Sequence, residues 1–150
     1  MDPLEVVRRF FQEVWNGRRL ELLDELVHPN CVTHQLRSVR GSVESLPRGP
    51  AALREHIAGW LKALPDISVT TDLQTALGPN VVSWVTMRGT HRGVWQGVLP
   101  TNRETTIRTV AQHRVENGRI VEDWVMVEAL GLFQQLRLVP PTPELLAAGR

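Results

Sequence analysis

The sequence has no tyrosine and a single cysteine, Cys31, among its 150 residues. One cysteine cannot form an internal disulfide, and so sparse a use of cysteine is typical of a reducing compartment. No apolar run reaches the length that crosses a membrane, and the N-terminal residues lack the apolar region of a secretion signal. We therefore expect a cytoplasmic protein without a membrane partner.

A strong net charge is also missing, because 17 basic residues are balanced by 16 acidic ones. This balance gives no support for a nucleic-acid partner. The five histidines are spread along the chain without a close pair, and no cysteine cluster accompanies them, so a metal site is not expected. The sequence contains neither a glycine-rich phosphate loop nor a serine elbow. We expect no cofactor.

Apolar residues at helical spacing predict three helices in the first part of the chain. Asp2 can cap the first helix, which ends at Asn16-Gly17. The second helix covers residues 18–27, and the third begins at Gly49-Pro50. Residues 37–48 show no periodicity, so we expect a loop there that is either a lid or a mobile segment.

Alternating residues predict strands in the second part of the chain. The last two of these strands are joined by Asn117-Gly118, the strongest short-range signal of a β-hairpin. A short helical turn is expected near 132–136, followed by a tail over 137–150 that could pack on a partner subunit or fray. The predicted strands are 67–75, 81–91, 105–115 and 119–128, with a brief strand at 31–36.

Helices followed by a meander of long antiparallel strands predict an α+β fold in a single domain over residues 1–150. Long strands curve because sheets twist. We expect a cone-shaped barrel, in which three N-terminal helices pack on the concave face of the sheet and enclose a pocket.

The final predicted strand has one unusual face. Alternation places Glu122, Trp124, Met126 and Glu128 on one side, and Val121, Val125 and Val127 with Asp123 on the other. Two carboxylates around Trp and Met are unlike a solvent face, so we interpret this face as a cavity wall with Glu128 deepest. The valine face suits a dimer interface, and we predict a homodimer.

Short motifs recur through the chain in a specific order and spacing. They are Phe11 with Trp15-Asn16-Gly17, His28-Pro29 before His34, Arg48-Gly49-Pro50, Leu64-Pro65-Asp66, Gly89-Thr90-His91, Pro100-Thr101, Arg114, the segment from Asn117 to Trp124, Glu128 and Gln134-Gln135-Leu136. Together they resemble the SnoaL-like polyketide cyclases, a family within the nuclear-transport-factor-2-like superfamily of α+β cones. The resemblance covers about residues 3–138.

This resemblance implies a cofactor-free intramolecular aldol ring closure of an aromatic polyketide ester. In such cyclases a pocket Asp is the general acid/base and a His lies near it. The Asp position falls on Glu128 here, and His113 on the paired strand is the nearest His, so these two are the expected catalytic residues. A carboxylate in an apolar pocket has a raised pKa, which lets it take a proton alpha to a carbonyl and return one to an alkoxide.

The remaining site candidates would bind a small hydrophobic or aromatic substrate. Trp95 and Trp124 offer flat apolar walls, and a histidine or Arg108 could donate to an enolate oxygen. Each histidine also has a structural interpretation in the core or in a turn, and Glu128 could be a solvated strand-end residue. The expected substrate-binding residues are His34, His91, Trp95, Trp124, Met126 and Phe11.

The absence of tyrosine separates this chain from other members of the superfamily. Enzymes like ketosteroid isomerase, scytalone dehydratase and limonene-epoxide hydrolase use a Tyr to position substrate or water. An isomerase or epoxide hydrolase of this superfamily therefore lacks its full residue set here, although a hydrolase using Asp123, Glu128 and an Arg stays open. The other alternative is a non-catalytic small-molecule binding protein with a Trp-lined pocket.

Overall fold

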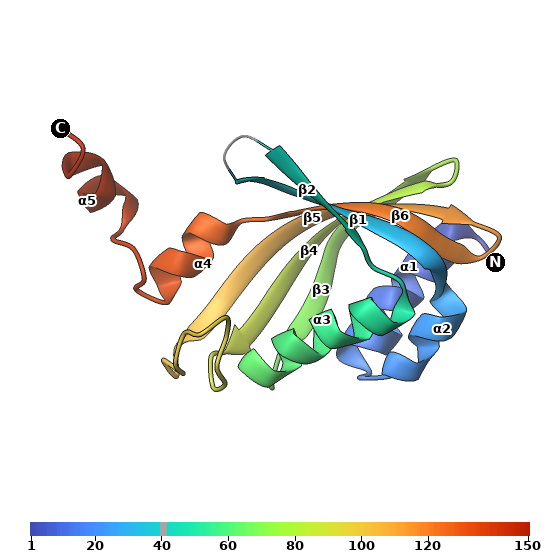
Figure 1. Cartoon of the computed structure of the whole chain (residues 1–150), viewed down its shortest axis with the longest axis horizontal. Helices are drawn as coiled ribbons and strands as arrows, with labels where there is room; N and C mark the ends of the chain where they lie inside the picture. The colour runs from blue at the N-terminus through green and yellow to red at the C-terminus, as the bar shows by residue number, and fades with distance from the viewer. Residues whose placement is uncertain (40–41) are drawn as a thin grey trace.

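A curved sheet of six strands carries the fold, and the helices pack on one side of it (Figure 1). The computed structural model describes residues 1–39 and 42–150. The strand order is β2-β1-β6-β5-β4-β3, so the two strands that precede the third helix lie at one edge. The strands are β1 (Val27–Val39), β2 (Ser42–Pro47), β3 (Ser68–Leu77), β4 (Asn80–Thr90), β5 (Glu104–Glu116) and β6 (Arg119–Val127).

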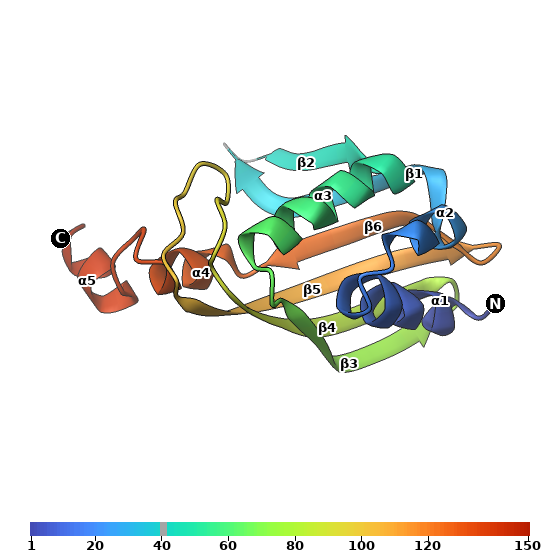
Figure 2. The same cartoon turned by 90° about the horizontal axis from the view of Figure 1, so that it is seen from below.

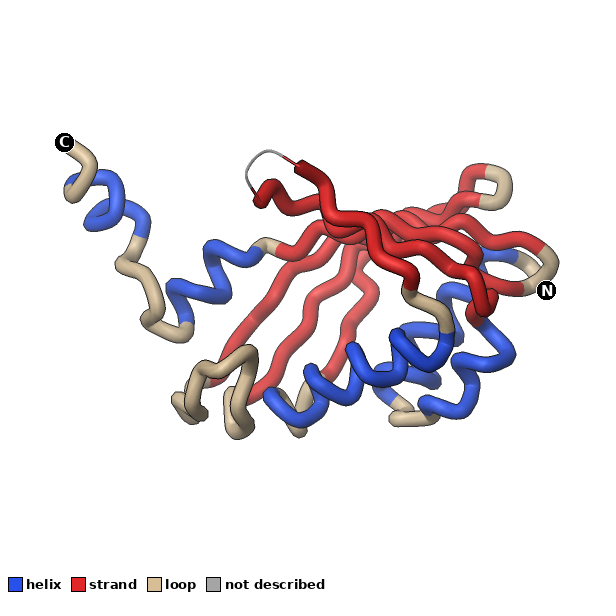
Figure 3. Tube along the Cα trace, in the orientation of Figure 1, coloured by secondary structure: helices blue, strands red, loops and turns tan. Residues whose placement is uncertain are grey.

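All neighbouring strands are antiparallel except β1 and β6, which are parallel. The expected α+β class and curved sheet with helices on its concave face are confirmed, but the sheet is open and does not close into a barrel (Figure 3). The sheet also contains more strands than the expected meander. The parallel β1–β6 pair arises because β1 enters the sheet from the helical layer beside the last strand, between β6 and the edge strand β2.

The helical layer begins with α1 (Pro3–Arg9), whose first turn is capped by the Asp2 carboxylate accepting from the Leu4 amide at 3.1 Å. It continues as the π-helical segment η1 (Phe10–Asn16). A π-helix is wider than an α-helix and is often found at functional sites. Phe10 and Phe11 are both buried here although they are adjacent in sequence.

The second helix is shorter than expected, because the chain enters β1 at Val27. It consists of the 3-10 turn η2 (Leu20–Leu22) and α2 (Leu23–Leu26), and it is followed after β2 by α3 (Pro50–Ala63). Figure 2 shows α1, α2 and α3 lying across the same face of the sheet.

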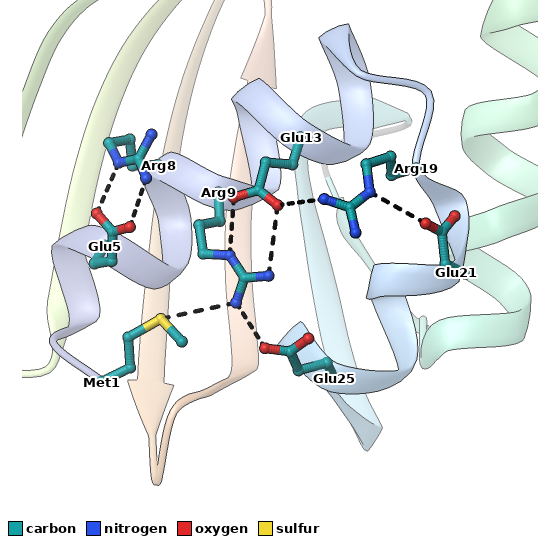
Figure 4. Close-up of polar contacts among 8 residues, drawn as sticks. All are labelled: Met1, Glu5, Arg8, Arg9, Glu13, Arg19, Glu21 and Glu25. Atoms are coloured by element: carbon teal, nitrogen blue, oxygen red, sulfur yellow. Dashed lines mark hydrogen bonds and ion pairs between the residues drawn. The ribbon is translucent and has the colours of Figure 1, made fainter.

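Ion pairs join the first helical segment to the second. The Arg9 guanidinium lies 3.0 Å from the Glu13 carboxylate and 2.6 Å from that of Glu25, and Arg19 reaches Glu13 at 3.1 Å (Figure 4). The side-chain amide of Asn16 connects the same helical layer to the edge strand β3 by two hydrogen bonds. It donates one to the Val69 carbonyl and accepts one from the Val69 amide. These contacts hold the helices over the sheet at a fixed position.

The prediction of a loop over residues 37–48 is wrong for most of that segment. Residues up to Val39 continue β1, and Ser42–Pro47 form β2, which pairs with β1 from Val32 to Gln35. Residues 40 and 41, part of the same predicted loop, lie outside the described residues. The sequence of this segment shows no regular alternation of apolar and polar residues, so alternation did not predict a strand there. The brief strand predicted at 31–36 is likewise part of this longer pair.

The C-terminal residues form two helices, α4 (Ala129–Gln135) and α5 (Thr142–Ala147). The first agrees with the predicted helical turn near 132–136. The second lies in the predicted tail, has no buried residue and stands away from the sheet in Figure 1. Among the described residues, no helix is both long and apolar enough to cross a membrane.

Candidate functional site

A cavity of about 270 Å³ lies between the concave face of the sheet and the helical layer. Residues of β5 and β6 form its floor, η1 and α3 cover it, and α4 and the loop between β4 and β5 close one end. Figure 2 shows this loop beside α4. The wall is mainly apolar, as is usual for sites that take small molecules. Its apolar residues include Phe10, Trp60, Met87, Ile107, Leu132 and Phe133.

The floor is made by the inward-facing residues of β5. Every second residue of this strand from Thr105 to Val115 is buried, so Thr109, Ala111 and His113 point to the same side. Their partners on β6 are Val127, Val125 and Asp123. The sequence places a small alanine between two polar residues, which leaves space above the middle of the strand.

His113 and Asp123 form the polar end of the cavity. They are direct cross-strand partners, and His113 Nε2 lies 3.5 Å from Asp123 Oδ2. Both side chains are nearly inaccessible to solvent, with 2% of the His113 side chain and 12% of the Asp123 side chain exposed. The separation exceeds an ordinary hydrogen bond, and catalytic hydrogen bonds often tighten only when the substrate is bound.

The surroundings of His113 favour its neutral form. The rings of Phe10 and Phe11 lie 5.5 and 5.8 Å from the imidazole. Burial lowers the pKa of His113, and the Asp123 carboxylate opposes this shift only in part. The neutral imidazole can donate one hydrogen bond and accept another while leaving no unpaired charge in the apolar wall.

Three polar atoms at this wall have no hydrogen-bond partner among the described residues. They are His113 Nδ1, Asp123 Oδ1 and the Thr109 hydroxyl oxygen. Buried polar groups are paired in the great majority of cases, so a group of unpaired ones in a cavity wall needs an explanation. A ligand that carries hydrogen-bonding groups supplies one.

Glu128 does not lie in this cavity. The end of β6 is at Val127, and Glu128 is an exposed residue whose carboxylate accepts from the Gly131 amide at 3.0 Å and so caps α4. The interpretation of Glu128 as the deepest residue of the cavity is wrong, because the chain leaves the strand before this position.

The face of β6 that carries Trp124 and Met126 is on the outside of the sheet. Met126 is 51% exposed, and His34 stacks on Trp124 with ring centroids 5.1 Å apart. His34 also bonds to Glu122 at 2.7 Å and to Ser45 at 2.8 Å. The prediction that this face lines the cavity is therefore wrong, and so is the prediction that the valine face is a dimer interface, because Val125 and Val127 line the cavity.

The other predicted residues divide between two places. His113, Phe11 and Trp95 line the cavity, which agrees with their expected location; their roles stay predictions. His91 is buried beside a separate space of about 10 Å³, where its Nδ1 accepts from the Thr101 amide. Trp95 contributes to both spaces and packs against Trp60 and Phe133 at ring distances of 5.8 and 6.1 Å.

The sequence offered signals for the residues that were missed. Alternation correctly separates Asp123 from Trp124. The valines on the same face as Asp123 led to the interpretation of that face as a dimer interface on the outside of the sheet. Valines are also the ordinary lining of an apolar cavity. The burial of Thr109 follows from the alternation of β5, but only once it is known that His113 points inward, because the two residues lie on the same face.

The described residues contain no group of three or more His, Cys, Asp or Glu side chains that could hold a metal ion. Cys31 is buried, and burial, together with the charge of Asp123, raises its pKa to about 12. Its thiol is therefore protonated at neutral pH and is a poor nucleophile.

Solved structures with the same fold cover nearly the whole chain. IdmH from Streptomyces antibioticus, described as a proposed polyketide cyclase, is 26% identical, with a TM-score of 0.76 over 91% of this chain and 99% of its own. AclR from Streptomyces galilaeus, described as a proposed hydroxylase, is 23% identical, with a TM-score of 0.78 over 98% and 89%. A SnoaL-like protein from Jannaschia sp. CCS1 is 19% identical, with a TM-score of 0.77 over 92% and 93%.

The comparison with curated proteins gave no match. The model of the SnoaL-like polyketide cyclase family matches residues 5–136, which include the helical layer, the whole sheet and α4. With this match over most of its length, the chain belongs to the SnoaL-like polyketide cyclase family.

Proposed function

We propose that the chain is a cofactor-free cyclase that closes a ring in a hydrophobic, aromatic polyketide ester by an intramolecular aldol reaction. Membership of the family supports the reaction class. The single observation that carries the proposal is the pairing of His113 with Asp123 at the polar end of an otherwise apolar cavity. An acid/base pair next to space for a small molecule is the arrangement that proton transfer at carbon requires.

In the proposed reaction the Asp123 carboxylate takes a proton from the carbon alpha to a carbonyl, and the C–H electrons form an enolate. The enolate carbon then attacks a second carbonyl of the same molecule, so one C–C bond forms and an alkoxide results. The alkoxide receives the proton from Asp123. The product is an isomer of the substrate, so the atoms balance without an oxidant or a second substrate.

Asp123 suits the role of the acid/base better than Glu128. The Asp123 carboxylate is buried at the cavity wall and its Oδ1 has no partner among the described residues, whereas the exposed Glu128 carboxylate is engaged by the Gly131 amide. His113 would orient Asp123 and stabilise its changing charge. Because burial lowers the pKa of His113, its imidazole is neutral in this role.

The test measures proton transfer directly. Aromatic polyketide methyl esters that carry a ketone–methylene side chain are incubated with the protein in D₂O, and deuterium at the methylene carbon is followed by NMR. Asp123→Asn should reduce the exchange rate by about 100-fold or more while ring binding is retained. Glu128→Gln is the matched control and should keep the parent rate. Equal exchange by parent and Asp123→Asn would refute the proposal.

The alternative function is a non-catalytic binding protein. The same cavity supports it, because an apolar wall with few polar groups binds small molecules whether or not a reaction follows. Tight binding of the esters by the parent protein, without deuterium exchange or cyclised product, would favour this alternative.

We also propose a homodimer, now through the outer face of the sheet. Leu73, Trp84, Val110 and Met126 are successive cross-strand partners over β3, β4, β5 and β6. Leu73, Trp84 and Met126 are 64%, 50% and 51% exposed, and an apolar row of this kind is typical of an interaction surface. A second copy can cover it by a two-fold contact. Sedimentation should give a dimer for the parent protein and a monomer for Trp84→Arg; a monomeric parent protein would refute the proposal.

A further inference from the structure

The hydroxyl of Thr109 is buried without a partner. Thr109 lies in the middle of β5, is 4% exposed and lines the cavity, and its hydroxyl oxygen has no hydrogen-bond partner among the described residues. A buried hydroxyl without a hydrogen-bond partner destabilises the folded protein, and a ligand that bonds to it would remove this penalty. Because Thr109 lines the cavity, a ligand in the cavity could supply that partner without moving the strand.

Thr109 lies on the cavity floor at a distance from the His113–Asp123 pair, between Ala111 and Ile107 on the inward face of β5. It is four positions from His113 along the same face of β5, which corresponds to about 13 Å between the Cα atoms. The floor between them is Ala111 with Val125 beside it, and neither can form a side-chain hydrogen bond. The floor therefore has two separate polar sites, Thr109 and the His113–Asp123 pair, with an apolar stretch between them.

We propose that Thr109 is a specificity-determining residue that hydrogen-bonds an oxygen of the ligand far from the reacting carbon. The corresponding ligand is a flat, elongated and mostly apolar ring system that has oxygen functions at both ends. One oxygen lies near Asp123 and His113, the rings lie over Ala111, and the other oxygen meets Thr109. This proposal rests on the proposed function for the role of Asp123, but the contact at Thr109 is a property of binding alone.

The small side chain of Ala111 keeps the two polar sites connected. A larger residue there would fill the space between them, since its neighbours Thr109 and His113 already occupy the same face. Phe10 and Phe11 of the helical layer cover the cavity at His113, so a ligand that reaches Asp123 lies between their aromatic rings and the sheet. A flat ring system fits between two such surfaces.

The experiment compares two ring compounds that differ by one hydroxyl, 2,6-dihydroxyanthraquinone and 2-hydroxyanthraquinone. Their dissociation constants are measured by calorimetry at one pH and salt concentration. The parent protein should bind the dihydroxy compound about fivefold more tightly, as expected for one net hydrogen bond. Thr109→Val has nearly the same shape without the hydroxyl and should abolish this preference. Thr109→Ser keeps the hydroxyl and should retain it.

Thr75→Val on the exposed strand β3 is the matched control and should preserve the parent preference. Thermal unfolding confirms that each variant is folded, and Thr109→Ala replaces Thr109→Val if the valine variant is not. Equal binding of both compounds by the parent protein would overturn the proposal, and so would a Thr109→Val variant that keeps the preference or loses affinity equally for both. These measurements do not involve turnover. A parent protein that shows the binding preference but no deuterium exchange would refute the proposed function and leave the proposal for Thr109 intact.

Discussion

His113 and Asp123 stand directly opposite each other on β5 and β6, with 3.5 Å between Nε2 and Oδ2. Their relative position is fixed by the backbone ladder of two long strands and not by a loop. Sites built on strands hold their geometry more accurately than sites on loops. The pair is therefore in place before any ligand arrives.

His113 should make the stability of the protein depend on pH. Burial lowers its pKa in the folded state below the ordinary value of 6.5, so the unfolded chain binds more protons as the pH falls through that value. Stability should be complete above about pH 6.5 and decrease below it, by about 1.4 kcal/mol per pH unit for one proton. His113→Phe should remove this slope between pH 5 and 8 in urea unfolding, while His28→Gln, outside the cavity, should retain it.

A second pH effect should arise on the outer face of the sheet. The bonds from His34 and then Arg114 lower the pKa of the Glu122 carboxylate below its ordinary value of 4.5. Because the folded pKa is depressed, the stabilising contribution is present above about pH 4.5 and is lost as the pH falls through the folded value. Acid unfolding of Glu122→Gln should lack this component. An acid-unfolding curve parallel to that of the parent protein would contradict the prediction.

Glu128 should matter for stability and not for chemistry. Its carboxylate caps α4, and removal of a side-chain cap costs about 0.5–2 kcal/mol. Glu128→Ala should lower the free energy of unfolding by an amount in that range, measured by denaturant titration. The deuterium-exchange rate per folded molecule should stay within about twofold of the parent rate, since the proton-transfer groups in the cavity are unchanged. Loss of exchange without loss of stability would restore Glu128 as a catalyst.

Trp95 should control how tightly the cavity holds a ring. Its indole comes from the loop between β4 and β5 and packs against Trp60 of α3 and Phe133 of α4. Trp95→Ala removes an aromatic wall and should weaken binding of 2-hydroxyanthraquinone by about tenfold, a typical cost for one lost aromatic contact. Trp84→Ala on the outer face is the control and should leave the affinity unchanged. Calorimetry distinguishes the two results.

Local patterns in the sequence were sufficient for much of the fold. The alternation of β5 and the Asn117-Gly118 turn predicted the central hairpin, and both turn residues adopt positive φ values of 49° and 75°. Helical spacing located α3 and the first helical segment. The strand at Ser42–Pro47 was missed because it is an edge strand that pairs with β1 alone and shows no clear alternation of apolar and polar residues. Long-range pairing, such as the parallel contact between β1 and β6, leaves no local signal.

The site was harder to predict because strand alternation gives two faces but does not say which is inside. Trp124 and Met126 appeared to be the cavity face from their composition, yet the helices cover the face of Asp123. The decision depends on where α1 and η1 dock, which is fixed by contacts such as that of Asn16 with Val69, far away in sequence. Glu128 was misplaced because the strand ends one residue before it.

The irregular register at the start of β6 has a wider consequence. Arg114 pairs with Glu122 but the next residue, Val115, pairs with Ile120, so Val121 is an extra residue in its strand. This bulge lets Ile120 and Asp123 both face inward although three positions separate them. Deleting Val121 would return the strand to regular alternation, in which Ile120 and Asp123 are two positions apart and still face the same side. If Val121 entered the regular pairing instead, the one-residue shift would turn either the core isoleucine or the cavity carboxylate outward. The inward position of the carboxylate in this chain thus depends on the bulge, and relatives that lack the extra residue should keep the same carboxylate in the cavity.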